Sequence, residues 1–206
     1  MNTPLRIALV GALLVSTLAA SGCVPLVATG AAVGTMAVLD RRTLGAQTED
    51  QSIEMKAASR IREMAPQVAD GVSVTSFNRK VLLTGQAATE DERRLVERAV
   101  AGVAGVQSIH NELQLQSRAT LRTAGSDASI TARVKTAFID AKDLQTNAFK
   151  VVTEAGTVYL MGLVSRREGD RAAQVASRVA GVQRVVTVFQ YIAEEDATRL
   201  SQQKPQ

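Results

Sequence analysis

The apolar positions of this chain change their period several times, from about 3.6 residues to 2 and back. Residues 51–64 predict a helix with an apolar face made of Ile53, Ala57, Ile61 and Met64. Two alternating stretches follow and predict strands, one through Val72 and Val74 and one through Val81 and Leu83. Asn78, which tolerates positive φ, lies in the link between them and predicts a hairpin turn.

A second helix and a third strand complete this unit. Thr89, followed three residues later by Glu92, predicts a capping box that opens the helix. The buried face of this helix is predicted to be Leu95, Val96, Ala99, Val100 and Val103. Gly105 ends the helix, and residues 106–115 predict a strand in which His110 is expected to face the solvent.

The same unit occurs twice in the chain. Residues 72–85 align without a gap to residues 149–162, and Ser52-Ile53 matches Ser129-Ile130 at the same offset of 77 positions. Gly156 takes the turn position in the second copy. The predicted fold class is therefore α+β, with two tandem small α-β-β-α-β domains, each having two helices packed on a three-stranded mixed sheet.

The composition between and around the copies predicts the domain boundaries. Residues 49–116 and 127–193 are the two domains, and the polar stretch 117–126 is read as a linker. Residues 23–48, rich in Gly, Ala and Thr, are read as a tether, and residues 194–206 as a flexible, charged tail.

The N-terminal segment is typical of an export signal. Residues 1–22 have a basic start, an apolar run from Ile7 to Val15 and small residues before Cys23, the only cysteine of the chain. The apolar run is too short to span a bilayer. We predict a lipoprotein signal peptide and a covalent N-acyl diacylglycerol, with its palmitate, on Cys23. An uncleaved anchor and an ordinary signal with a free cysteine remain alternatives.

The sequence gives little support for catalysis, metal binding or nucleic-acid binding. The net charge is only +4, and no Lys/Arg cluster alternates with aromatic residues, which make up 3% of the chain, so no nucleic acid is expected as a partner. With one His and one Cys, no metal site is predicted. The chain has no nucleophile elbow, P-loop or dinucleotide fingerprint, and Gly85 and Gly162 are read as turn residues. We expect no enzyme, no cofactor and no small-molecule substrate.

The charge is distributed unequally, and the second domain carries the excess of cations. Residues 49–118 hold 9 basic and 10 acidic side chains, whereas residues 127–193 hold 9 and 6. In a predicted helix over 128–142, the inner face is Ile130, Val134, Ala137, Phe138 and Ala141. Ile139 lies on the opposite side, flanked by Lys135 and Lys142, with Arg133 at the rim. An exposed apolar residue beside cations is typical of a helix that touches an anionic bilayer, although an ordinary solvated helix face is the alternative.

Several motifs resemble the BON domain. They are Val81-Leu-Leu-Thr-Gly85 with Val103-Ala-Gly-Val106, and Val158-Tyr-Leu-Met-Gly162 with Val179-Ala-Gly-Val182. The stretches Gly30-Ala-Ala-Val-Gly-Thr35 and Asp40-Arg-Arg-Thr-Leu-Gly-Ala-Gln47 also resemble the dual-BON outer-membrane lipoproteins. The resemblance covers nearly the whole chain.

The resemblance implies a non-enzymatic protein on the periplasmic side of the outer membrane, which binds anionic phospholipid and supports envelope integrity. Val24 after Cys23 agrees with outer-membrane sorting. The first helix of the second domain is the element expected to contact lipid, and Ser129 stands where relatives can carry an aromatic residue. The candidate lipid-binding residues are Ser129, Ile130, Arg133, Lys135, Thr136, Ile139 and Lys142. The alternative is a protein-interaction scaffold that docks an envelope protein partner and uses its lipid only as a tether.

Overall fold

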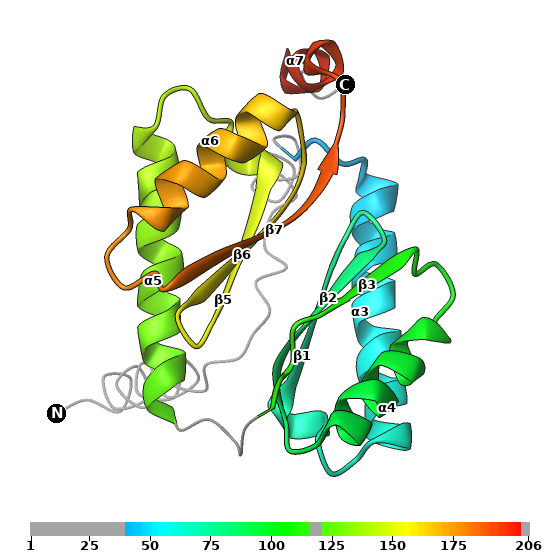
Figure 1. Cartoon of the computed structure of the whole chain (residues 1–206). Helices are drawn as coiled ribbons and strands as arrows, with labels where there is room; N and C mark the ends of the chain where they lie inside the picture. Colours follow the sequence, from blue (N-terminus) through cyan, green and yellow to red (C-terminus); the bar gives the residue numbers. More distant parts are fainter. Residues whose placement is uncertain (1–39, 116–120, 203–206) are drawn as a thin grey trace, which may run out of the picture. The chain divides into compact units, whose positions relative to one another are not determined.

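Each half of the chain folds into two helices packed on a small mixed sheet (Figure 1). The computed structural model describes residues 40–115 and 121–202, which all belong to the compact unit Ala37–Gln206. The first domain contains α3 (Leu44–Met64), β1 (Val72–Phe77), β2 (Lys80–Ala87), α4 (Glu90–Ala101), β3 (Ser108–Asn111) and β4 (Gln114–Leu115). The second contains α5 (Leu121–Asp140), β5 (Phe149–Glu154), β6 (Thr157–Val164), α6 (Arg166–Ser177) and β7 (Arg184–Tyr191), followed by α7 (Glu194–Gln202). The predicted α+β fold of two tandem α-β-β-α-β domains is confirmed.

The two sheets share one topology. β1 pairs antiparallel with β2, and β5 with β6, while β2 and β6 pair in parallel with the strand that follows the second helix. In the first domain this third strand is interrupted, because β3 and β4 both pair with β2 and Glu112 and Leu113 lie between them. The prediction of one continuous strand over residues 106–115 was therefore wrong. At the break, the side-chain oxygen of Asn111 accepts a hydrogen bond from the Leu113 amide (3.3 Å).

The hairpin turns form where the sequence predicts them. Asn78 and Arg79 have φ of 49° and 65°, and Ala155 and Gly156 have φ of 48° and 75°. Two consecutive residues with positive φ are typical of a type I′ turn, whose twist matches that of the flanking strands.

The second helix of each domain begins with a capping box. The Thr89 hydroxyl accepts a hydrogen bond from the Glu92 amide, and the Glu92 carboxylate accepts one from the Thr89 amide, as predicted. Ser165 and Glu168 form the same reciprocal pair at the start of α6. Two free amides at each helix start are therefore satisfied by side chains of the helix itself.

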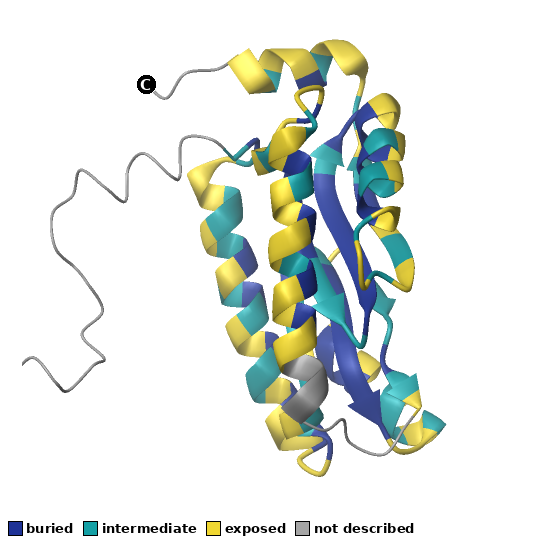
Figure 2. Cartoon of the chain, turned by 90° about the vertical axis from the view of Figure 1, so that its left-hand side faces the viewer, coloured by how far each residue is buried: buried dark blue, intermediate teal, exposed yellow. Residues whose placement is uncertain are grey.

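Each domain has its own apolar core between its helices and its sheet. In the first, the core includes Ile53, Ala57 and Ile61 of α3, with Val81 and Leu83 of β2 and Val96 and Val100 of α4. In the second, it includes Ile130, Val134 and Phe138 of α5, with Val158 and Leu160 of β6 and Phe189 of β7. Figure 2 shows the result, with strands that are mostly buried and helices whose outward faces are exposed.

A third apolar cluster joins the two domains. It consists of the buried residues Phe77, Leu82, Tyr159, Met161 and Val188. Leu82 lies between Val81 and Leu83 along β2, so its side chain points to the face of the sheet that the helices leave uncovered. The helix-free faces of the two sheets therefore pack on each other through this cluster, which we call the interdomain cluster.

Gly85 and Gly162 lie inside strands, so the prediction that they are turn residues was wrong. Gly85 is paired with Val72 in β2, and Gly162 with Phe149 in β6. A Cβ atom on Gly85 would lie 2.0 Å from the Gly71 carbonyl oxygen, and one on Gly162 would lie 2.6 Å from the Ala148 oxygen. Both positions need glycine because another part of the backbone passes close to them.

Three predicted boundaries differ from the structure. Helix α3 begins at Leu44, with Thr43 as its N-cap, so the C-terminal end of the predicted tether 23–48 is helical. Helix α5 begins at Leu121, inside the predicted linker 117–126. Residues Glu194–Gln202 form α7 and do not extend as a flexible tail, because Ala197 is buried and the Ser201 hydroxyl accepts a hydrogen bond from Arg41. Among the helices that the structure describes, none combines the length and the apolar character needed to cross a bilayer.

Candidate functional site

Helix α5 has one face in the core and one in solvent. Ile130, Val134 and Phe138 are spaced four residues apart, which places them on one side of the helix, and all are buried. Phe138 also packs edge to face on Phe149, with ring centroids 5.2 Å apart. These contacts fix the rotation of α5 about its axis and therefore determine which residues face outward.

Ile139 lies on the outward side of α5, and 67% of its surface is exposed. Lys135 and Thr136, which precede Ile139 by four and three residues, are exposed beside it. Lys142 is exposed as well, but it follows the last helical residue, Asp140, so the predicted helix end at 142 lies two residues too far. The predicted exposed apolar side chain with neighbouring cations is therefore present.

Two of the candidate residues are held by bonds within the helix. The Arg133 guanidinium donates a hydrogen bond to the Ser129 hydroxyl (3.0 Å), and the Thr136 hydroxyl donates one to the Ala132 carbonyl (3.1 Å). Both bonds connect residues four apart on the exposed side. They keep the Arg133 side chain close to the helix surface while its charge stays in solvent.

Ile130 is a core residue, and its place among the candidate lipid-binding residues is not supported by the structure. Only 2% of its surface is exposed, and its side chain lies against Gly181, where an added Cβ would come within 3.1 Å of Cγ1. Cys23, the predicted lipidation site, lies outside the described residues. The surface that can meet a ligand is therefore formed by Ser129, Arg133, Lys135, Thr136, Ile139 and Lys142, which we call the α5 surface.

Acidic residues near the α5 surface are partly neutralised. The Asp143 carboxylate accepts a hydrogen bond from Arg171 of α6 (2.8 Å). This bond is the main reason that the pKa of Asp143 lies below its usual value. Asp143 thus stays ionised, and its charge is matched by Arg171.

The matching helix of the first domain presents a different surface. Met55 of α3 is 68% exposed, which is nearly the exposure of Ile139. Its neighbour Glu54 forms an ion pair with Lys150 (3.0 Å), and Arg62 occupies the repeat position that corresponds to Ile139. Met55 is therefore an exposed apolar side chain among charges of both signs, and α3 can serve as a control for the α5 surface.

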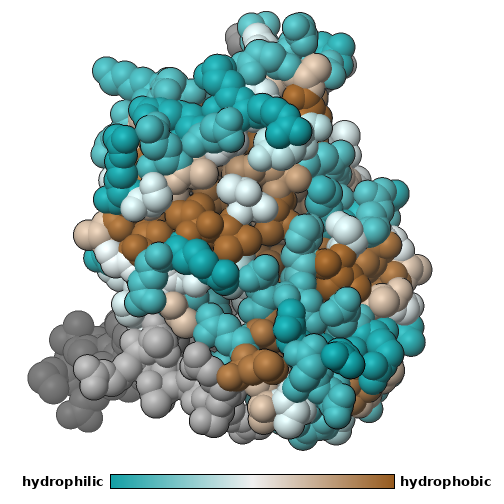
Figure 3. All heavy atoms as spheres, in the orientation of Figure 1, coloured by the Kyte–Doolittle hydropathy of each residue, from teal (hydrophilic) through white to brown (hydrophobic). Residues whose placement is uncertain are grey.

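Among the residues whose burial the structure describes, the exposed apolar side chains are scattered. Those of large size are Leu44, Met55, Met64, Leu115, Ile139 and Tyr191. Figure 3 shows a largely hydrophilic face on which the broadest hydrophobic area lies over β7, the edge strand of the second sheet. Single exposed apolar residues are ordinary on a protein surface, so the cations around Ile139 are what distinguish its site.

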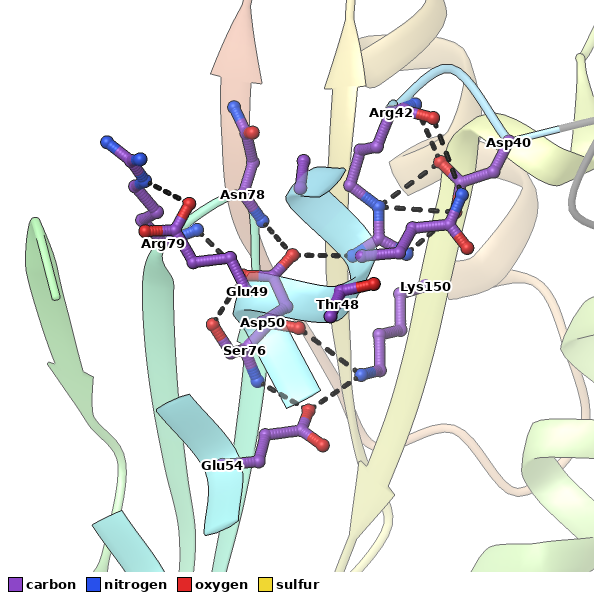
Figure 4. Close-up of polar contacts among 12 residues, drawn as sticks. Asp40, Arg42, Thr48, Glu49, Asp50, Glu54, Ser76, Asn78, Arg79 and Lys150 are labelled. Atoms are coloured by element: carbon purple, nitrogen blue, oxygen red, sulfur yellow. Dashed lines mark hydrogen bonds and ion pairs between the residues drawn. The ribbon is translucent and has the colours of Figure 1, made fainter. Parts of the chain in front are cut away.

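Sequence reasoning missed a carboxylate that organises each hairpin turn. Asp50 of α3 accepts hydrogen bonds from the amides of Asn78 (2.7 Å) and Arg79 (2.8 Å) and from the Ser76 hydroxyl (2.6 Å) (Figure 4). In the second domain, Asp127 accepts hydrogen bonds from the amides of the corresponding turn residues 155 and 156, at 2.8 and 2.9 Å. The two aspartates are separated by the 77 positions of the repeat, and that offset was a signal for them.

The electrostatics of Asp50 follow from these contacts. Burial by itself would raise the pKa of Asp50, but the hydrogen bonds from Ser76, from the two turn amides and from Arg42 outweigh it, so the pKa lies below its usual value. The charged form of this carboxylate is therefore the form that the fold stabilises.

The sequence predicted that His110 faces the solvent, but the structure places it in a half-buried position. It pairs with Leu82 across β2 and β3, and Leu82 belongs to the interdomain cluster. Burial and then the nearby charge of Lys80 lower the pKa of His110, against the opposing charge of Glu112. The difference arises because the strand face that carries His110 packs toward the second domain.

Comparison with known proteins agrees with this architecture. The BON domain model matches residues 49–117 and 126–193, which are the two α-β-β-α-β units described above. The chain thus belongs to the BON-domain family and carries two such domains in tandem.

Two relatives match most of the chain. Outer membrane lipoprotein DolP of Haemophilus influenzae is 34% identical over 182 residues, which cover 87% of this chain and 94% of that protein. The 21 kDa hemolysin of Actinobacillus pleuropneumoniae is 32% identical over 155 residues, which cover 75% of this chain and 80% of that protein. The BON resemblance noted in the sequence is therefore confirmed.

Proposed function

We propose that this protein is a non-enzymatic lipoprotein of the outer membrane, facing the periplasm, which binds anionic phospholipid through the α5 surface and supports envelope integrity. Its anchor is an acylated Cys23 that follows a signal peptide, residues 1–22. The similarity to outer membrane lipoprotein DolP over 87% of the chain supports this location. The single observation that carries the binding proposal is the exposed Ile139 among the cations of α5.

The chemistry of the α5 surface fits a membrane of negative charge. Lys135, Lys142 and Arg133 each contribute attraction of about 1 kcal/mol when they lie close to anionic headgroups. Ile139 can insert its apolar side chain between the headgroups, while the hydroxyl of Thr136 remains at the polar level. Such a contact is weak by itself, and a covalent lipid that already holds the chain at the membrane makes it sufficient.

Vesicle binding tests the proposal. We expect Ile139→Asp and Lys135→Glu each to weaken binding to phosphatidylglycerol vesicles by about tenfold, because each adds a negative charge and removes either the apolar contact or a cation. The assay uses residues 23–206 with Cys23→Ser, which lack both the apolar signal segment and the acylation site. This chain is incubated with vesicles and separated by flotation. Phosphatidylcholine vesicles measure the contribution of charge.

Met55→Asp is the matched control, since Met55 is as exposed as Ile139 but lies on α3. It should leave vesicle binding unchanged. Equal binding by the wild type, Ile139→Asp and Lys135→Glu would contradict the proposal. In that case, crosslinking from α5 to a specific envelope protein in intact cells would favour the scaffold function.

A further inference from the structure

The segment of four residues that precedes α3 contacts both domains through two of its side chains, Arg41 and Arg42. We call Asp40, Arg41, Arg42 and Thr43 the strap. The Arg41 guanidinium reaches the second domain, where Nη1 and Nη2 donate to the two carboxylate oxygens of Glu168 at 2.8 and 2.7 Å. Nη1 also donates to the Leu163 carbonyl (3.0 Å), and Nη2 to the Ser201 hydroxyl (2.7 Å). One side chain of the strap therefore contacts the end of β6, the start of α6 and helix α7.

The next residue of the strap binds the first domain. Arg42 Nη1 donates to Asp50 (2.7 Å), and its guanidinium carbon lies 4.1 Å from the centre of the Phe77 ring. Asp40 accepts further hydrogen bonds from the same guanidinium, as Figure 4 shows. Because Arg41 and Arg42 are adjacent, the backbone between them physically links the two domains.

The Arg41–Glu168 pair is more deeply buried than the other ion pairs between the domains. Its side chains are only 3% and 6% exposed, and its geometry is bidentate. In the Lys150–Glu54 pair, the side chains are 38% and 31% exposed. In the Arg184–Glu112 pair, they are 58% and 30% exposed. Exposed pairs are screened by solvent and contribute little, whereas a buried pair that loses one partner leaves an uncompensated charge.

The apolar contact between the domains is small. The interdomain cluster has five buried side chains, whereas the separate cores of the first and second domains have 12 and 13. Most of the buried apolar side chains therefore lie in the two separate cores, and fewer hold the domains together. The strap supplies the one buried ion pair that joins the two domains among the described residues.

We propose that the strap is a lock: the Arg41–Glu168 pair holds the two BON domains closed, and its loss lets them separate while both stay folded. Separation exposes the interdomain cluster to water. The lock itself does not depend on lipid binding by the α5 surface.

Thiol labelling measures this opening. The full chain with Cys23→Ser has no other cysteine, so a single introduced thiol reports its own exposure. Met161→Cys places it in the interdomain cluster, and Leu160→Cys places it in the core of the second domain, at the adjacent position of the same strand. The rate of iodoacetamide labelling of each thiol is compared in three backgrounds: no further change, Arg41→Ala, and Arg167→Ala. The last is the control, because it removes an arginine of α6 whose ion pair with Glu194 is exposed.

We expect Arg41→Ala to accelerate labelling at Met161→Cys by about tenfold or more and to leave labelling at Leu160→Cys unchanged, since a factor of ten corresponds to ~1.4 kcal/mol of lost closure. Arg167→Ala should change neither. Glu168→Gln, which keeps the shape of the side chain, should act like Arg41→Ala. Unchanged labelling at Met161→Cys, equal acceleration at both positions, or a chain that no longer folds would each overturn the lock.

Discussion

Gly85→Ala is expected to destabilise the first domain strongly while leaving the stability of the second unchanged. Gly85 has φ of +111°, a conformation that side-chain-bearing residues rarely adopt, and an added Cβ would lie 2.0 Å from the Gly71 carbonyl oxygen. Backbone strain and overpacking each cost about 1–3 kcal/mol, so the loss is about 3–5 kcal/mol, a large part of the stability of a small domain. Hydrogen exchange of the amides in β1 and β2, compared with those in β5 and β6, measures it.

Two other glycines provide graded controls. Gly162 occupies the same place in the second domain, but an added Cβ meets the Ala148 oxygen at 2.6 Å and φ carries no penalty, so Gly162→Ala should cost less. Gly125 on α5 has open space around it, and Gly125→Ala should be neutral or slightly stabilising. Equal stability of the Gly85→Ala and Gly125→Ala variants would contradict the steric argument.

The sequence predicted those parts of the fold that depend on local patterns. Alternation through Val81 and Leu83 gave the strands, and the Thr89–Glu92 spacing gave a helix start that the structure confirms. The packing of the second sheet face was not predicted, although β6 has a continuous apolar run, Val158-Tyr-Leu-Met161, which is typical of a strand buried on both faces. A run of this kind shows that both faces are covered, but it does not show what covers them.

The start of α3 was missed for a related reason. Its first two turns carry no apolar stripe, and they are held by the Thr43 cap and by the contacts of Arg41 and Arg42 with residues far along the chain. Such contacts leave no periodic trace in the sequence. The α5 surface could be predicted because helical geometry alone places Ile139 opposite Val134 and Phe138. The same geometry also places Ile130 in the core, where the resemblance to a family had suggested lipid contact.

Asp50→Ala is expected to destabilise the first domain by about 3–5 kcal/mol. The change leaves the buried Ser76 hydroxyl and the partly buried turn amides of Asn78 and Arg79 without their acceptor. It also removes one partner of Arg42. Asp127→Ala should cost less, because that carboxylate accepts two hydrogen bonds from its turn. Asp70→Ala, at an exposed position, is the control, and urea unfolding followed by circular dichroism gives the free energies.

The effect of Asp50 should also depend on pH, with a sign set by its pKa. Because the pKa of Asp50 is lower in the folded than in the unfolded chain, the ionised carboxylate stabilises the fold. This contribution is complete above the unfolded value of about 3.9 and is lost as the pH falls through the lower, folded value. Glu168, whose pKa is lowered by Arg41 and the Ser165 amide against the effect of burial, adds a loss of the same sign. The difference between wild type and Asp50→Asn cancels the Glu168 contribution, so this difference should be constant between pH 5 and 7 and shrink below pH 4. A difference that stays the same at pH 3 would show that the carboxylate acts through its shape and not through its charge.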